Sequence, residues 1–261
     1  MPKKDLQDDE RKSPFERYLS IIEIVAAAHD GLTLTDIAKI ADLPKPTVHR
    51  LTRVLLDSGA LVAEDRRQKQ FRIGPRIWRV LYLGFEPDSL VRYAQMACDA
   101  AASRLKETCY IVRLGRTDVR TVARATPDQG YRLHVYPGSD LPIHAAASAK
   151  AIIAFQPEKE VMRYIREPLP RFTPYTNTDV SVFLAELKKT RKRGYAICDR
   201  EIDEHVMAYA VPVHLPNAGV LFSVGVTGPC SRLLQHPVAF YIDGLKEAAD
   251  QFARALQTTQ R

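Results

Sequence analysis

The sequence predicts an α+β protein made of two folded domains, a small helical domain followed by a larger mixed one. Its 261 residues exceed one average domain and fit two, of roughly 80 and 170 residues. Apolar residues recur at helical spacings from Phe15 to Leu55, whereas strand-like and helical runs alternate beyond residue 108. A break at Pro87-Asp88 separates the two patterns.

The N-terminal pattern begins with a helix after Ser13, a suitable N-cap that is followed by Pro14 in the first turn. Apolar residues at spacings of three and four predict one buried stripe on this helix. The expected stripe consists of Phe15, Tyr18, Leu19, Ile22 and Val25.

Two further helices are predicted on either side of a tight turn at Asp42-Leu43-Pro44. The first follows Thr33. The second runs from about Lys45 to Ser58, because Pro46 is tolerated in a first turn whose N–H groups have no intrahelical partner. The inner face of this second helix is expected at Val48, Leu51 and Leu55. Its outer face carries the polar and basic residues Lys45, Thr47, His49, Arg50 and Arg53.

A basic hairpin is expected after Gly59, which suits a helix C-cap. Two β-prone runs, ALVAED and QFRIG, flank a tip that contains Arg66, Arg67 and Lys69. This order of elements predicts a winged helix-turn-helix over residues 14–75, a domain that binds double-stranded DNA. The outer helix residues reach base edges or phosphates, with arginine the strongest reader of guanine, and the wing holds phosphates.

The charge distribution supports a polyanionic partner. The chain carries a formal net charge of +7, and the stretch from Lys45 to Arg79 holds nine Lys and Arg residues and three acidic ones. That stretch therefore carries +6, while the other 226 residues together carry about +1. Taken alone, the basic stretch could also be a solvent-exposed face with no polyanionic partner.

Several other classes of protein are disfavoured. No stretch approaches the roughly 18–20 apolar residues of a membrane helix, and residues 1–13 are expected to be a disordered lead-in, not a signal peptide. The four cysteines have no ligand spacing, so we expect free thiols, no metal and a cytoplasmic location. We find no cofactor or catalytic motif such as GxGxxG, a P-loop, HExxH or Gly-x-Ser-x-Gly.

A linker helix is expected over residues 76–87, including the single tryptophan, Trp78. An apolar helix leaving a small domain is costly if exposed, so we expect it to dimerise or to dock on the second domain. A homodimer suits the reading of successive major grooves, and a tetramer is compatible with it. A long helix then runs to about Lys106, with a buried stripe at Leu90, Tyr93, Ala94, Ala97 and Ala101.

Strands, then helices, then strands again describe the region 88–261. This order predicts an α+β domain with a largely antiparallel sheet, whose concave face is a common type of small-molecule site. Strands are expected at 109–114, 119–125, 131–136, 195–198, 206–214 and 220–227, and helices at 144–155, 158–166, 180–193 and 237–256.

The chain resembles the IclR family of bacterial regulators over nearly its whole length. The matching segments are SPFERYLSIIEIV, GLTLTDIAKIADLPKPTVHRL and LLDSGALV, then GSDLPIHAAASAKAIIAF, LPRFTPYTNTD, LKKTRKRGYAICDREI, and YAVPV followed by VGVTGP. The resemblance implies a GAF-like effector-binding domain that controls DNA binding. Asp42 stands where the family commonly has glycine, but aspartate visits the left-handed region with little strain, so the turn is expected to survive.

Candidate effector residues fall in three places. The segment His144, Ala145, Ala146, Ala147 and Ser148 opens a predicted helix whose accessible N–H groups suit a carboxylate, although close packing on the sheet also favours alanine. The resemblance adds Asp199 and Glu201 to the pocket lining. Ala208 and Gly225 stand where the family often has Cys and Ser, and the lost volume favours a larger effector such as an aromatic acid. Met207, Ser223 and Arg124 are further candidates.

Two rival functions remain open at this point. One is an α+β enzyme acting on a small acid, for which the only pairing is His144 with Ser148, four residues apart on one helix. The other is a DNA-binding scaffold without a ligand, against which the size of the second domain argues. Repression and activation are equally compatible with the sequence.

Overall fold

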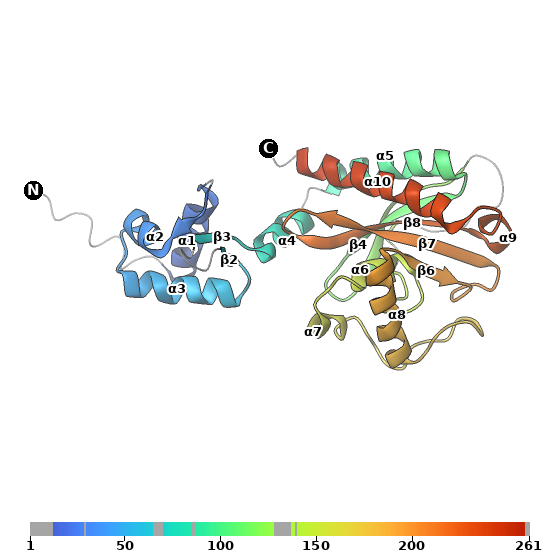
Figure 1. Cartoon of the computed structure of the whole chain (residues 1–261), viewed down its shortest axis with the longest axis horizontal. Coiled ribbons are helices and arrows are strands. Elements are labelled where there is room, and N and C mark those ends of the chain that lie inside the picture. The colour runs from blue at the N-terminus through green and yellow to red at the C-terminus, as the bar shows by residue number, and fades with distance from the viewer. Residues whose placement is uncertain are drawn as a thin grey trace, which may run out of the picture. The chain divides into compact units, whose positions relative to one another are not determined.

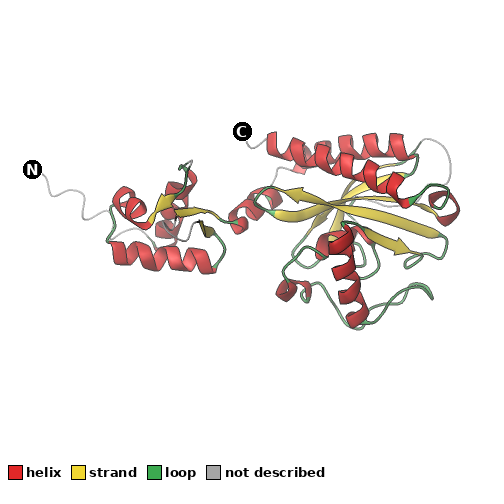
Figure 2. Ribbon diagram, in the orientation of Figure 1, coloured by secondary structure: helices red, strands yellow, loops and turns green. Residues whose placement is uncertain are grey.

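The computed structural model describes residues 13–28, 30–64, 70–84, 87–127, 137–138 and 140–258. Three expectations lie outside these residues: the lead-in up to residue 12, the tip of the wing, and the strand at 131–136. The chain divides into two compact units, residues 1–84 and 85–261. Figure 2 shows helices with a few short strands in the first unit and one broad sheet covered by helices in the second.

The first unit is a winged helix-turn-helix (Figure 1). Its strands form an antiparallel sheet in the order β1-β3-β2, and β2 and β3 are the two arms of the predicted wing. The elements in chain order are α1 (Pro14–Ala26), β1 (Leu32–Thr33), α2 (Leu34–Ala41), α3 (Lys45–Asp57), β2 (Leu61–Glu64), β3 (Gln70–Ile73) and α4 (Pro75–Leu83).

Local sequence signals set the helix ends of this unit. Ser13 caps α1, and its hydroxyl accepts a hydrogen bond from the Glu16 N–H at 3.2 Å. Thr33 and Asp36 form a second reciprocal capping box at the start of α2. Asp42 ends α2 in the left-handed conformation, with φ 53° and ψ 42°, as expected from its tolerance of that region.

One cluster of apolar side chains joins the helices and the sheet of the first unit. It contains the predicted inner face of α3 and the buried residues of α2, Ile37 and Ala38. The stripe predicted for α1 is partly wrong, because Phe15 is 71% and Leu19 is 41% exposed. The buried face of α1 instead centres on Ile21 and Val25, with Tyr18 and Ile22 packed beside them, so it is rotated away from Phe15.

The second unit is built on a five-stranded antiparallel sheet in the order β5-β4-β8-β7-β6. The α+β class and the antiparallel sheet are therefore as expected. Its strands are β4 (Thr108–Leu114), β5 (Val119–Ala125), β6 (Ala196–Asp199), β7 (Val206–Leu215) and β8 (Gly219–Pro229). Its helices are α5 (Pro87–Leu105), α6 (Ala147–Ile153), α7 (Glu158–Val161), α8 (Val180–Arg193), α9 (Cys230–Leu233) and α10 (Val238–Thr258).

The sheet separates two layers of helices. In Figure 1, α5 and α10 lie together on one face, and α6 lies on the other with α8 beyond it. Aromatic pairs join the sheet to α10: Phe222 meets Phe252 edge-on, with ring centroids 5.3 Å apart, and Tyr209 stacks on Tyr241 at 5.6 Å. Alternate residues of the strands therefore face α10 and α6.

Small side chains allow α6 to pack closely on the opposite face. Ala147 and Ala151 of α6 form one buried cluster with side chains of β6 and β7. The strand members of this cluster are Ala196, Cys198, Ala208 and Ala210. The alternative reading of the alanine-rich segment, close packing on the sheet, thus applies to Ala147.

Two predicted helices are shorter than expected. The segment His144–Ala146 forms a turn before α6, and Ala146 itself is extended, with φ −70° and ψ 128°. Both Ala145 and Ala146 donate to the Pro142 carbonyl, which closes this turn separately from the helix. Likewise α7 ends at Val161, because Arg163 and Tyr164 make only i→i−3 bonds. No helix among the described residues is long and apolar enough to cross a membrane.

Candidate DNA-binding face and effector site

The exposed face of α3 carries the residues predicted to meet DNA. Lys45, His49, Arg50 and Arg53 are exposed and Thr47 is half-buried, while Val48, Leu51 and Leu55 pack into the core. Thr52 is also buried, and its hydroxyl donates to the Val48 carbonyl at 2.8 Å. The helix thus presents a single polar side.

The position of each residue around the helix shows which side chains point away from the core. At about 100° per residue, Arg50 and Arg53 point directly away from the buried face, with Pro46 between them in angle. His49 and Thr47 flank this line on its two sides. Neither arginine joins an ion pair with another described residue, so both guanidinium groups are available for base edges or phosphates.

The two arms of the wing are regular antiparallel strands. Glu64 of β2 pairs with Gln70 of β3, and the ladder continues to Leu61 opposite Ile73. Arg66, Arg67 and Lys69 lie between these strands and outside the described residues. Their phosphate contacts stay a prediction.

In the second unit, several predicted effector residues come together on the side of the sheet that faces α6. The Ser223 hydroxyl donates to the Ser148 carbonyl at 2.9 Å, and Ala208 packs against Ala147. Strand register places Arg124 opposite Tyr110 and Tyr110 opposite Gly225, so these three residues share that face.

The volume argument from Gly225 is wrong, because Tyr110 fills the space beside it. A Cβ atom at Gly225 would lie 2.8 Å from Cζ of the Tyr110 ring. Burial raises the pKa of this phenol. The small residue at 225 thus accommodates an aromatic side chain of the chain itself. Ala208 is likewise used in helix packing, so neither position supports the inference of a larger effector.

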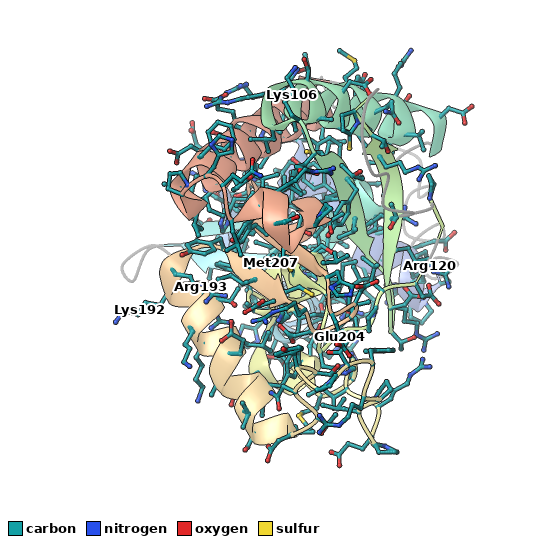
Figure 3. All side chains as sticks on the ribbon, turned by 90° about the vertical axis from the view of Figure 1, so that its right-hand side faces the viewer. Lys106, Arg120, Lys192, Arg193, Glu204 and Met207 are labelled. Atoms are coloured by element: carbon teal, nitrogen blue, oxygen red, sulfur yellow. The ribbon has the colours of Figure 1, made fainter. Side chains whose placement is uncertain are left out.

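Asp199 and Met207 lie on the other face. They pair with each other across β6 and β7, each one position away from Cys198 or Ala208, which face α6. The side-chain alternation of a strand therefore turns them away from α6, and the Asp199 carboxylate pairs with the Arg200 guanidinium at 2.8 Å. Met207 is also distant from the β5 edge that carries Arg120 (Figure 3).

Glu201 meets a residue that the sequence analysis missed. Its carboxylate lies 2.5 Å from the Lys150 ammonium, and the side chains are 15% and 2% exposed. Burial raises the pKa of Glu201, and the charge of Lys150 opposes the rise. A charged residue inside the otherwise apolar run AAASAKAIIAF was the available signal, because a buried lysine requires a partner.

Hydrogen bonds connect loop 170–178 to the backbone at Arg200 and Glu201. The Thr176 hydroxyl donates to the Glu201 carbonyl and the Thr173 hydroxyl to the Arg200 carbonyl, each at 2.6 Å. His144 Nε2 lies 2.9 Å from the Pro170 carbonyl, so Nε2 carries the proton. Burial lowers the pKa of His144, and this hydrogen bond opposes the shift. The imidazole therefore favours its neutral form.

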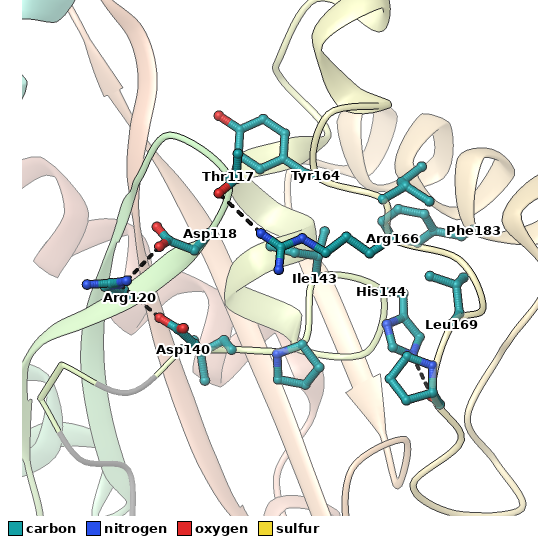
Figure 4. Close-up of a pocket in the computed structure, with 14 residues that line it drawn as sticks. Thr117, Asp118, Arg120, Asp140, Ile143, His144, Tyr164, Arg166, Leu169 and Phe183 are labelled. Carbon is teal, nitrogen blue, oxygen red and sulfur yellow. Dashed lines mark hydrogen bonds and ion pairs between the residues drawn. The ribbon is translucent and has the colours of Figure 1, made fainter.

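A pocket of about 410 Å³ adjoins His144 (Figure 4). It lies between the β4–β5 turn, the segment before α6 and the loop after α7. His144 is the one predicted effector residue in its lining, which also includes Thr117, Arg120, Asp140, Ile143, Arg166 and Phe183. Sequence spacing gave no sign of this pocket, because its walls come from four separated segments.

A winged helix-turn-helix joined to an α+β domain is the architecture of a DNA-binding transcriptional regulator, and comparison with known proteins supports that class. The model of the IclR helix-turn-helix domain matches residues 15–65, and the model of the bacterial transcriptional regulator IclR C-terminal domain matches residues 87–254. The chain belongs to the IclR family. Members of this family are transcriptional regulators and not enzymes, so the enzyme alternative is set aside.

Curated relatives align over most of the chain. The probable transcriptional regulator SauR of Cupriavidus necator is 29% identical over 241 residues, covering 91% of this chain and 94% of that protein. The regulator BhcR of Paracoccus denitrificans is also 29% identical, with 91% and 85% covered. The repressor AllR of Salmonella typhi is 24% identical, with 92% and 89% covered.

Solved structures share the fold. The IclR protein of Thermotoga maritima aligns with a TM-score of 0.60 at 23% identity, over 93% of this chain and 98% of that one. An IclR homolog from Microbacterium hydrocarbonoxydans, solved in complex with 4-hydroxybenzoate, aligns with a TM-score of 0.58 at 24% identity, over 94% and 100%. The predicted fold class is confirmed by these likenesses.

Proposed function

We propose that this chain binds a specific operator sequence and that a small organic acid, held in the C-terminal domain, controls this binding. The observation that carries the proposal is the polar face of α3, with Arg50 and Arg53 at its centre and Lys45, Thr47 and His49 around them. Arginine side chains on a recognition helix read guanine in the major groove.

In this proposal residues 14–75 read DNA, residues 76–87 link the domains and residues 88–261 bind the effector. The protein acts in the cytoplasm as a homodimer or tetramer, which brings two recognition helices to successive grooves. The wing residues Arg66, Arg67 and Lys69 add affinity through phosphates.

The effector is an acid bound on the α6 side of the sheet, close to His144. Two observations support this location: the pocket beside His144, and the hydrogen bond that holds His144, in the turn before α6, on the Pro170 carbonyl. The homolog solved with 4-hydroxybenzoate supports an aromatic acid as one class of effector.

Fluorescence anisotropy tests both parts of the proposal. DNA from upstream of the chain's own gene is compared with scrambled DNA of equal length while the salt concentration is varied. We expect preference for the upstream DNA and affinity that falls steeply with salt, because phosphate contacts release counterions. Absence of sequence preference at every salt concentration would contradict the proposal.

The effector part is tested by adding aliphatic and aromatic acids to the preformed complex. We expect at least one acid to change operator affinity. If no acid does so while operator binding is specific, the chain is a DNA-binding scaffold without a ligand.

A further inference from the structure

The first turn of the linker helix α4 is hydrogen-bonded to the C-terminal end of α3. The Gly74 N–H donates to the Ala60 carbonyl at 2.8 Å, and the Arg76 N–H donates to the Gly59 carbonyl at 3.1 Å. The Arg76 guanidinium adds a third bond, from Nη1 to the Ser58 carbonyl at 3.2 Å. Three successive carbonyls at the end of α3 thus accept hydrogen bonds from the start of α4, all within the first unit.

The end of α3 has a well-defined geometry of its own. Gly59 has φ 74°, a left-handed conformation that suits glycine and ends the helix. Its N–H donates to the Leu56 carbonyl, and the Ala60 N–H donates to the Leu55 carbonyl, each at 2.9 Å. These two bonds form a Schellman motif, which satisfies carbonyls of the last helical turn. The next three carbonyls, from Ser58 to Ala60, are the ones that α4 binds.

The two segments meet backbone to backbone, and only glycine fits at position 74. A Cβ atom at Gly74 would overlap the Gly59 carbonyl oxygen and would lie 2.9 Å from the Ala60 carbonyl carbon. Both are backbone atoms, so rotation of a side chain cannot relieve the overlap. Any side chain at position 74 therefore moves the start of α4 away from the end of α3.

The charge of Arg76 favours the same contact. The C-terminal end of a helix carries a partial negative charge, because its last carbonyls have no partner within the helix. Arg76 is exposed, and α3 has no basic residue in its own last turn. The guanidinium of Arg76 therefore supplies from α4 the positive charge that stabilises this helix end.

The orientation of α3 determines where its arginines lie. Arg50 lies eight residues before Ser58, which is roughly 12 Å along the helix at about 1.5 Å per residue. A rotation of the helix by about 10° about its C-terminal end would therefore displace Arg50 by roughly 2 Å. Hydrogen bonds to a base edge, whose lengths vary over about 0.5 Å, do not survive such a shift.

We propose that Gly74 and Arg76 are positioning residues for operator binding. They hold the end of α3 on the linker helix, so that α4 sets the orientation in which Arg50 and Arg53 meet the bases. This inference rests on the proposed function, in which those two arginines read the operator. It adds residues that act through α3 and not by touching the DNA.

Fluorescence anisotropy with the full chain tests the role of Arg76, with the ratio of operator affinity to scrambled-DNA affinity as the readout. Arg76→Gln should lower this ratio about fivefold or more, because the end of α3 loses its charged hydrogen bond. Arg76→Lys keeps a positive donor at the helix end and should retain most of the ratio. Lys39→Gln is the matched control, because it removes one positive charge from an exposed site of α2 in the same unit, and it should leave the ratio unchanged.

A direct contact of Arg76 with a DNA phosphate is the alternative, and it predicts a different result. Loss of a phosphate contact weakens binding to operator and to scrambled DNA equally, and it reduces the slope of log affinity against log salt concentration by about one. An unchanged ratio in Arg76→Gln, with or without that change of slope, overturns the proposal.

Gly74→Ala tests the contact between the two helices without changing any charge. It should lower the ratio about tenfold or more, because the added Cβ atom separates α4 from the end of α3. Chemical denaturation shows whether this variant is folded, and Arg76→Gln, at an exposed site, keeps the test decisive if it is not.

The wild type separates this inference from the function on which it rests. Equal affinity of the wild type for both DNAs contradicts the proposed function and the inference with it. A wild-type preference for the operator that persists undiminished in Arg76→Gln, or in a folded Gly74→Ala protein, contradicts the positioning role alone.

Discussion

The buried ion pair between Lys150 and Glu201 joins α6 to the segment that follows β6 in the second unit. The ammonium is almost completely removed from water, so its charge must be balanced by the carboxylate that comes from another segment. Glu201 was expected near an effector because of a family resemblance, whereas the structure pairs it with a lysine of α6. Sequence alone does not reveal such a pair, since the two residues are separated by about fifty positions.

The ion pair leads to a stability prediction. Glu201→Ala leaves a buried ammonium without a partner and should lower the free energy of unfolding by about 3–5 kcal/mol. Chemical denaturation measures the change, and Glu204→Ala, at an exposed site in the same turn, should cost much less. The double variant Lys150→Met/Glu201→Leu should be less destabilised than Glu201→Ala, because it leaves no buried charge without a partner. A loss of similar size in the Glu204 control would refute the assignment.

His144 predicts a dependence of stability on pH. Its pKa in the folded chain is lowered from the ordinary 6.5, so below that pH the unfolded chain binds more protons than the folded one. The stability contribution of neutral His144 is therefore present above pH 6.5 and is lost as the pH falls. Chemical denaturation between about pH 5 and pH 8, the range in which histidine changes its charge, measures this loss. On acidification the free energy of unfolding should fall less in His144→Gln than in the wild type.

The control for that profile is His205→Gln. His205 is exposed, so this variant removes a histidine without removing the buried imidazole. If the free energy of unfolding changes with pH in the same way in the wild type and in His144→Gln, burial of this imidazole does not contribute to the pH dependence of stability.

At the scale of elements, the helix-turn-helix is the part that the sequence predicts best. α3 was expected from Lys45 to Ser58 and spans Lys45–Asp57, because proline, apolar periodicity and Gly59 are all local signals. α6 was placed three residues too early. Alanine has the same helical preference on both sides of the break at Ala146, and the anchor of the preceding turn, His144 on Pro170, is a distant contact.

The turn before α3 gives a prediction at this scale. Asp42 has φ 53°, a conformation that costs most residues about 1–2 kcal/mol and costs glycine nothing. Asp42→Gly should therefore retain or raise the free energy of unfolding, and Asp42→Val should lower it by more than 1 kcal/mol. Denaturant titration compares them, and equal stabilities would contradict the left-handed assignment.

In the whole molecule, the two units present two different kinds of surface. The first unit presents an exposed polar face with free arginines, and the second has an open pocket beside His144. Periodicity and charge were sufficient to locate the first of these. The pocket depends on four segments that the fold brings together, so a single position such as Gly225 does not predict it.

Arg50 and Arg53 of α3 are the residues that we propose read the operator. Anisotropy with operator and scrambled DNA at one salt concentration tests this proposal most directly, with Arg50→Ala, Arg53→Ala and Lys188→Ala, an exposed cation of α8 in the second unit. Each arginine variant should lose about 1–3 kcal/mol of operator binding, with much less change on scrambled DNA, and Lys188→Ala should match the wild type. Arginine variants that keep the wild-type preference for the operator would contradict the claim.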